Sequence, residues 1–311
     1  MADGSKTVIY AALAGNFLIA CTKFAAAAFT GSAAMLSEGV HSLVDTGNEL
    51  LLLYGMRRAG EPPDRSHPLG HGRELYFWSF IVALLVFALG AGVSVYQGIH
   101  HILDPAPIES PNWNYAVLGA SFLFEGITWI VALREFRRQK GSLGYFEAIT
   151  RSKDPTTFTV LLEDSAALIG LAIAFVGIIL ADRLAIPELD GAASICIGLL
   201  LAAVAILLAR ESKGLLIGEA AIPAVQDAIL SIAQADPSIQ KANGLVTTHL
   251  GPHQVIVALS AEFEDDMTAP QIEACVKRVE MRIKAEHPDV TTLFIKPQTA
   301  GSYMRRTQAI V

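Results

Sequence analysis

A histidine and an aspartate four residues apart are the first feature of this 311-residue chain that could bind a metal ion. His41 and Asp45 lie in a largely apolar stretch, and their spacing places both side chains on one face of a helix. Imidazole and carboxylate together suit zinc and neighbouring first-row metals. Glu38, Asn48 and Glu49 extend the same face. The alternative is a buried His–Asp hydrogen bond that only packs helices, but so many polar groups on one face favour a polar pathway.

A second cluster is the adjacent pair Glu163 and Asp164, in an apolar stretch without lysine or arginine. An ionised carboxylate without a partner costs roughly 2.5–3.5 kcal/mol at the centre of a membrane-spanning helix. A bound cation or a proton is therefore the expected partner. Because neighbouring residues of a helix point about 100° apart, the two acids are expected to have different roles.

A third group of possible ligands lies in the loop after the stretch that carries His41 and Asp45. Asp64, His67 and His71 occur within eight residues of a polar loop, where they could form an entry site for a metal near the cytoplasmic surface. The alternative is a solvated turn with incidental histidines. His249 and His253 flank a predicted hairpin turn and are a weak metal pair.

Other polar residues have simpler interpretations. His100 and His101 lie at the outer end of an apolar stretch, where they could be interfacial. Glu125 could pair with Lys23 as a structural ion pair or take part in transport. Asp190 opens another apolar stretch and is expected to cap that helix.

The composition indicates which elements must position these residues. The hydrophobic share is 52%, the mean hydropathy is +0.45, and charged residues make up 17%, against about 25% in a typical soluble domain. A membrane protein is therefore predicted, rather than a soluble enzyme or a disordered chain. The net charge of −7 argues against a nucleic-acid partner. Cys21, Cys196 and Cys275 are too far apart in the sequence for a CxxC zinc site or a disulfide framework.

Six stretches are apolar over the roughly 20 residues that a bilayer requires. They are residues 7–30, 32–56, 74–103, 112–134, 156–181 and 189–210. The chain start leads directly into the first of them, which we interpret as a span and not as a signal peptide. Lysines and arginines gather in the loops on one side, and only Arg183 lies in those on the other. This asymmetry predicts that both termini are cytoplasmic.

The last hundred residues have the charge density of a soluble domain. Their periodicity predicts an α-β-β-α-β order, with helices at 222–235 and 268–287 and strands at 244–249, 254–264 and 290–296. The tail after Pro297 has no evident pattern and is expected to be mobile. The predicted fold is thus a six-helix integral membrane domain over 1–211, followed by a cytoplasmic, ferredoxin-like α+β domain over 212–311.

The chain resembles the cation diffusion facilitator family of transporters over residues 7–297. The motifs that carry this resemblance are Ser-Glu-Gly-Val-His-Ser-Leu-Val-Asp at 37–45 and His-Pro-Leu-Gly-His-Gly at 67–72. Leu-Leu-Glu-Asp-Ser-Ala-Ala at 161–167 and Pro-Ile-Glu-Ser at 107–110 are similar to a divergent branch that includes a mitochondrial zinc exporter. The resemblance implies a homodimer, not an enzyme, which exchanges a divalent metal for protons by alternating access and exports it from the cytoplasm. Zinc is the expected ion, with manganese, iron, cobalt and nickel as alternatives.

The resemblance also implies a ligand set within the membrane. It assigns His41, Asp45 and Asp164 as ligands, the last because Gly170 follows it by six residues as in the family pattern. The fourth family position falls on Val160, which cannot bind metal. Glu163, Asn48 or water is then expected to complete the site or relay protons.

Two further implications concern the regions outside the spans. Asp64, His67 and His71 match the family's loop site. Lys296 and Gln298 stand where zinc-binding relatives have ligands, so the C-terminal domain is expected to dimerise without a binuclear zinc site.

Other readings of the chain stay open. It could transport a different cation, or it could be a degenerate metal-binding membrane protein that does not transport. A membrane-embedded hydrolase is disfavoured. The expected location is a bacterial inner membrane, with an organelle membrane as the alternative.

Overall fold

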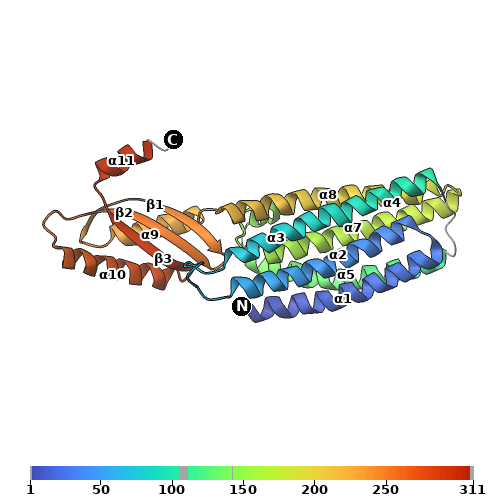
Figure 1. Cartoon of the computed structure of the whole chain (residues 1–311), viewed down its shortest axis with the longest axis horizontal. Coiled ribbons are helices and arrows are strands. Elements are labelled where there is room, and N and C mark those ends of the chain that lie inside the picture. The colour runs from blue at the N-terminus through green and yellow to red at the C-terminus, as the bar shows by residue number, and fades with distance from the viewer. Residues whose placement is uncertain (1, 106–110, 142, 309–311) are drawn as a thin grey trace. The chain divides into compact units, whose positions relative to one another are not determined.

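The computed structural model describes residues 2–105, 111–141 and 143–308 (Figure 1). The chain divides into two compact units. The first comprises Met1–Pro62 and Glu74–Lys213, and the second comprises Pro63–Arg73 and Gly214–Val311. The second unit is therefore discontinuous in sequence, because it includes a loop that the sequence analysis attached to the membrane part.

Long helices make up the first unit. They are α1 (Ala2–Thr30), α2 (Ala33–Ala59), α3 (Arg73–Leu85), η1 (Val86–Ala91), α4 (Gly92–Leu103), α5 (Pro111–Lys140), α6 (Tyr145–Arg151), α7 (Pro155–Leu184) and α8 (Glu188–Ile217). The segments α3, η1 and α4 follow one another without a break, and η1 is a π-helical turn, a rare feature often found at functional sites. The short helix α6 was not expected from the sequence.

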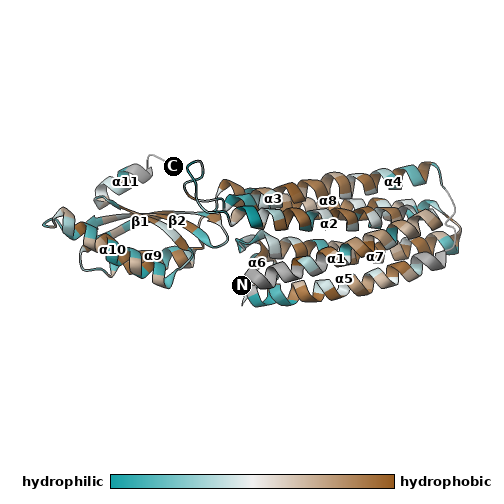
Figure 2. Cartoon of the chain, turned by 60° about the horizontal axis from the view of Figure 1, so that its bottom comes forward, coloured by the Kyte–Doolittle hydropathy of each residue, from teal (hydrophilic) through white to brown (hydrophobic). Residues whose placement is uncertain are grey.

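Five helical segments of the described chain are long and apolar enough to cross a membrane, and Figure 2 shows the apolar residues along them. They are Leu13–Thr30, Arg73–Leu103, Tyr115–Arg138, Phe158–Leu184 and Glu188–Ile217. The sixth expected span corresponds to α2, which is 27 residues long but is not among these five segments. Its polar face explains this difference.

The start of α2 is fixed by contacts with α8. Ser32 is the N-cap, and its hydroxyl accepts a hydrogen bond from the backbone N–H of Met35. The carboxylate of Asp190 accepts hydrogen bonds from the Ser32 hydroxyl at 3.0 Å and from the Ala34 N–H at 3.2 Å. Asp190 was expected to cap its own helix, but these contacts join the beginnings of α2 and α8.

Glycines allow α4 and α8 to approach closely. A Cβ atom at Gly98 would lie 2.5 Å from the carbonyl oxygen of Gly191, and one at Gly191 would lie 2.7 Å from the carbonyl oxygen of Gly98. Small residues at such positions let helix backbones pack directly. The helix α2 packs against α1, α7 and η1, so the residues on its polar face meet other helices of the unit.

The second unit is a three-stranded sheet with helices. Its elements are α9 (Pro223–Gln234), β1 (Ile239–Gly251), β2 (Gln254–Phe263), α10 (Ala269–Glu286), β3 (Val290–Pro297) and α11 (Ala300–Gln308). Strands β1 and β2 are antiparallel, and β2 and β3 are parallel. Ile229, Val257, Leu259, Val279 and Ile283 form the centre of its core. The α-β-β-α-β order predicted from the sequence is present.

After Pro297, where the sequence has no evident pattern, the chain forms the helix α11. The Thr299 hydroxyl accepts a hydrogen bond from the Ser302 N–H, as at a helix N-cap. The Glu262 carboxylate accepts one from the Ala300 N–H. The Tyr303 hydroxyl occupies the space that a side chain at Gly244 would need. The contacts with Glu262 and Gly244 join residues far apart in sequence, and no local pattern contains them.

Candidate metal sites

One face of α2 carries a row of buried polar side chains. Its members are Glu38, His41, Ser42, Asp45, Asn48 and Glu49, and none is more than 4% exposed. Polar residues of three other helices are also buried: Asn16 and Lys23 of α1, Glu125 of α5, and Glu163 and Asp164 of α7. Such a concentration within membrane-spanning helices is typical of an ion pathway.

His41 and Asp45 form the pair that the sequence predicted. The Nδ1 atom of His41 lies 3.3 Å from Oδ1 of Asp45. Both ring nitrogens of His41, Oδ1 of Asp45 and Oδ2 of Asp164 are buried without a hydrogen-bond partner. Since buried polar atoms are almost always hydrogen-bonded, these atoms fit a site that receives a cation or protons.

The structure does not bring the ligand atoms of His41, Asp45 and Asp164 all within 4.8 Å of one another. The helices that carry them nevertheless pack together, and the charges of Glu163 and Asp164 act on Asp45. A shared ion would therefore require these ligand atoms to move closer together.

Glu163 and Asp164 have different surroundings, as expected for neighbours on a helix. The side-chain amide of Asn48 donates a hydrogen bond of 2.7 Å to Glu163. Asp164 has one carboxylate oxygen without a partner. In α2, Glu49 accepts a hydrogen bond of 2.9 Å from Asn16, and its other oxygen has no partner.

Val160 lies in an apolar cluster with Phe136 and Phe158. It is one turn before Asp164, at the position where the family pattern has a ligand. The surroundings of Val160 are thus as unsuited to metal as its side chain. The predicted pair of Lys23 and Glu125 is present at 3.8 Å, and a shorter pair joins Lys23 to Glu38 at 3.0 Å.

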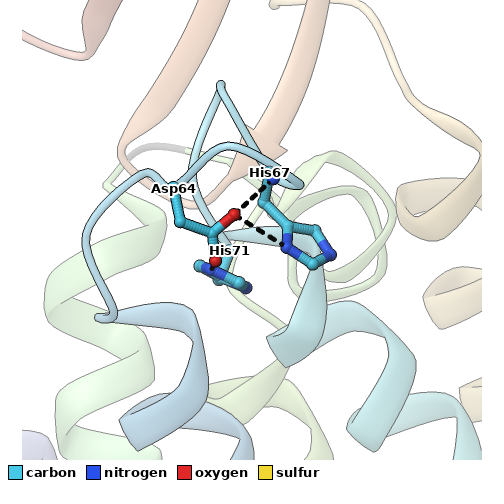
Figure 3. A group of neighbouring side chains, drawn as sticks. All are labelled: Asp64, His67 and His71. Carbon is cyan, nitrogen blue, oxygen red and sulfur yellow. Dashed lines mark hydrogen bonds and ion pairs between the residues drawn. The ribbon is translucent and has the colours of Figure 1, made fainter.

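Asp64, His67 and His71 converge in the loop before α3 (Figure 3). Among the described residues, only these form a group of three or more His, Cys, Asp or Glu side chains with ligand atoms within 4.8 Å of one another. Nδ1 of His67 lies 3.4 Å from Oδ1 of Asp64, and Nε2 of His71 lies 3.3 Å from Oδ2 of the same residue. Nδ1 of His71 is buried and has no partner.

The carboxylate of Asp64 is held by its own loop. The Ser66 hydroxyl and the backbone N–H groups of His67 and Ser66 donate hydrogen bonds to it, at 2.6–2.7 Å. These bonds hold the pKa of Asp64 well below its usual range, with the Ser66 hydroxyl contributing most. Asp64 therefore stays ionised under any physiological condition, as a metal ligand must.

The loop packs on the β1–β2 turn of the same unit. The Gln254 side-chain amide donates a hydrogen bond of 2.8 Å to the carbonyl oxygen of Leu69. A Cβ atom at Gly72 would lie 2.5 Å from the carbonyl oxygen of Leu250, so only glycine fits there. Gly70 has a φ of +85°, a conformation that favours glycine.

The remaining histidines are placed apart from these sites. Nδ1 of the buried His249 lies 3.2 Å from the Gly251 carbonyl oxygen, whereas the exposed His253 pairs with Asp289. His249 and His253 do not belong to a group of three possible ligands within the described chain. Nε2 of His101 lies 4.0 Å from Asp190.

Two residues of the first unit were missed by the sequence analysis. Asn16 binds Glu49, and its presence in an apolar span was a signal that could have been used. Thr159 is 1% exposed, its hydroxyl has no hydrogen-bond partner, and it lies one turn before Glu163. Its type is common in helices, so nothing in the sequence distinguished it.

Comparisons with known proteins give a consistent result. Residues 9–217 match the family described as the cation efflux transmembrane domain. The chain is 35% identical over 263 residues to the mouse "Proton-coupled zinc antiporter SLC30A9, mitochondrial", covering 84% of this chain and 46% of that protein. It is 31% identical to "Metal tolerance protein C4" of Arabidopsis thaliana over 85% of this chain and 58% of that protein. It is 25% identical to "Cation-efflux pump FieF" of Cronobacter sakazakii, over 92% and 91% respectively. The chain thus spans about half the length of the mouse protein.

Proposed function

Since the chain belongs to the cation efflux family of membrane proteins, we propose that it transports a divalent metal cation, zinc, in exchange for protons. The observation that carries this proposal is the set of buried atoms without partners on His41, Asp45 and Asp164. The printed name of the mouse relative supports zinc and protons as the ions, and that of the bacterial relative supports efflux as the direction. We propose that this efflux is from the cytoplasm.

The three side chains account for coupling to protons. Zinc binds neutral imidazole and ionised carboxylate, so His41, Asp45 and Asp164 must each be free of an added proton when they hold the ion. When zinc leaves, the buried carboxylates lose the cation that compensates their charge, and protons replace it. Metal and protons thus compete for one set of atoms. Alternating exposure of this set to the two sides of the membrane gives antiport.

Val160 leaves the fourth position to another group. Glu163 becomes available if its hydrogen bond from Asn48 breaks, and water is the other choice. We propose that Asp64, His67 and His71 hold a second metal ion outside the spans, where their ligand atoms already converge.

The assembly and the orientation are also proposals. The lysines and arginines of the loops support cytoplasmic termini, and membership of the family supports a homodimer. The bacterial relative is consistent with a bacterial inner membrane, and the printed name of the mouse relative is consistent with an organelle membrane.

The proposal is tested by zinc flux into proteoliposomes that contain the purified chain, a zinc dye and a pH dye. We expect zinc entry driven by a pH gradient with opposite proton movement, and at least a hundredfold loss in His41→Ala and Asp164→Asn. Asp182→Asn is the matched control, because Asp182 is an exposed acid of the same helix as Asp164. Full transport in either site variant would contradict the assignment.

A non-transporting metal-binding protein is the second candidate, and Val160 at a ligand position is the observation that favours it. The same vesicles distinguish the two functions. Zinc binding that depends on His41 without any zinc flux would support the second candidate and remove the first.

A further inference from the structure

One lysine lies completely buried inside the helical unit. Lys23 of α1 is 0% exposed, and no other lysine or arginine of the described chain is among the buried residues. Its ammonium group donates hydrogen bonds to Oε2 of Glu38 at 3.0 Å and to the Ser42 hydroxyl at 2.8 Å. Oε1 of Glu125 lies 3.8 Å away. The lysine is therefore held by α2 and α5 together.

The structure leaves space for this arrangement on a fourth helix. A Cβ atom at Gly170 of α7 would lie 2.5 Å from Oε1 of Glu38, so any larger residue would displace the carboxylate from Lys23. A buried charge that loses its partner is strongly destabilising, which explains why the two charges must be kept together. The stability of the bundle does not require the ion pair, because two apolar residues at these positions would stabilise it as well.

The lysine is close to the proposed zinc ligands. Its partner Ser42 directly follows His41, and the Lys23 charge acts on the His41 imidazole. Glu125, which also pairs with the lysine, acts electrostatically on Asp45 and Asp164. Among the described residues, the buried polar groups of the helical unit thus include several acids and one lysine, and that lysine acts on a metal ligand.

We propose that Lys23 is a resident counter-cation that weakens zinc binding at His41, Asp45 and Asp164 and so allows the ion to leave. The inference rests on the proposed function of that site. A fixed positive charge repels a divalent cation, and repulsion between buried charges several ångströms apart is large enough to change a dissociation constant tenfold or more. The Glu38 carboxylate holds the ammonium in place, and its own negative charge acts on the ion in the opposite direction.

A purely structural ion pair predicts a different result. If Lys23 and Glu38 only stabilise the bundle, loss of either residue should disturb the site and weaken zinc binding. If Lys23 acts through its charge, the two losses should change zinc affinity in opposite directions, and loss of both should restore it. The direction of change therefore distinguishes the two roles.

The experiment measures zinc dissociation constants at one pH for the purified full chain. The parent carries Asp64→Ala, His67→Ala and His71→Ala, so that the loop cannot bind metal. We expect Lys23→Met to lower the dissociation constant about tenfold and Glu38→Gln to raise it about tenfold. The double variant should return to within about threefold of the parent. In vesicles, Lys23→Met should reduce both KM and kcat, because zinc binds more tightly and leaves more slowly.

Lys23→Gln covers the case in which the methionine variant does not fold. Its amide can still donate hydrogen bonds to Glu38 and Ser42 but carries no charge, and the same tenfold decrease is expected. Weaker or unchanged zinc binding in a folded Lys23→Gln variant would overturn the proposal. His41→Ala in the same parent tests the site itself. If that variant binds zinc as the parent does, the proposed transport site is wrong and the role of Lys23 falls with it. If His41→Ala loses zinc binding, the proposed site stands, and the Lys23 variants then test the role of the lysine by themselves.

Discussion

At the scale of single residues, the polar face of α2 combines groups that have hydrogen-bond partners with groups that have none. Asn48 donates to Glu163, and Asn16 donates to Glu49, whereas His41 has no hydrogen-bond partner on either nitrogen. Glu38, Asn48 and Glu49 each also have one buried oxygen without a partner, but only His41 of this face lacks a partner on every polar side-chain atom. The two asparagines hold their partners' carboxylates in fixed positions.

Gly170 offers a test at this scale. In Gly170→Ala the new methyl group would collide with the Glu38 carboxylate, which lies against Lys23. We expect zinc transport in vesicles to fall at least tenfold, although alanine favours helix over glycine by about 1 kcal/mol. Gly126→Ala is the control, because a Cβ atom there would meet nothing within 4 Å. Equal transport by both variants would show that the position of Glu38 does not matter.

Residue spacing predicted part of this arrangement. His41 and Asp45 belong to one helix, so their proximity follows from local geometry. The Asn48–Glu163 bond joins positions 115 residues apart, and no local pattern contains such a pairing. The partners of Lys23 were only partly predicted for the same reason, since Glu125 was named but Glu38 and Ser42 were not.

At the scale of elements, the contact between α4 and α8 depends on the absence of side chains. Gly98 and Gly191 each lie against the other's backbone. A Cβ atom at Gly198 would lie 3.0 Å from the carbonyl oxygen of Ala91. The N-terminal end of α2 is fixed to the same helix α8 through Asp190. We infer that α2, α4 and α8 are joined at this end, while the polar face of α2 turns to α1 and α7.

Gly98→Ala should separate α4 from α8. Its Cβ would lie 2.5 Å from the Gly191 carbonyl oxygen and 2.9 Å from the Ile195 nitrogen, contacts that only movement of a backbone can relieve. We expect the melting temperature of the purified protein in detergent to fall by several degrees, as overpacking typically costs about 1–3 kcal/mol. Gly92→Ala, where the nearest atom is 3.8 Å away, should be neutral or stabilising. An unchanged melting temperature for Gly98→Ala would contradict the close contact.

The helices and strands were largely predictable, because periodicity and apolar length are properties of a short window. The π-helical turn at Val86–Ala91 and the helix α11 were not. A π turn depends on how neighbouring helices pack. The start of α11 is held by a cap at Thr299 and by a hydrogen bond to Glu262 of β2.

At the scale of the whole molecule, stability against acid is expected to be set partly in the second unit. Arg278 makes two hydrogen bonds to Asp236, at 3.0 and 3.2 Å, and the Ser238 N–H makes another. Burial acts to raise the pKa of Asp236, but these bonds outweigh it and the pKa is lowered overall. Burial also raises the pKa of Cys275 to about 11, so its thiol stays protonated and donates to Asp236.

A lowered carboxyl pKa stabilises the folded state above the unfolded value of about 3.9, and that stabilisation is lost as the pH falls through the lower folded value. We therefore expect Asp236→Asn to destabilise the unit by about 1 kcal/mol at pH 7. When the pH falls from 5 to 3, the stability of this variant should decrease less than that of the wild type. Hydrogen exchange of β1 and α10 in the full chain, corrected for the intrinsic rate at each pH, measures this. Asp266→Asn, at an exposed position, is the control, and identical acid sensitivity of the two variants would refute the role of Asp236.

The division of the chain also shows what the sequence could not reveal. A change in composition near residue 212 predicts a domain boundary there, because a membrane and water select different residues. The 63–73 loop belongs to the second unit through contacts of Gln254 and Gly72. Amino-acid composition does not predict such contacts.

That loop has a consequence for the order of events during synthesis. Leu69 leaves the ribosome 185 residues before Gln254, the residue that fixes its carbonyl group. Asp64, in contrast, is held by Ser66 and His67, which are made almost at the same moment. The turn around Asp64 can therefore form as soon as the second helix has been made, while its attachment to the strands waits until most of the chain has been made. A newborn chain stalled between these two points would already carry this turn, but not yet the hairpin against which it packs.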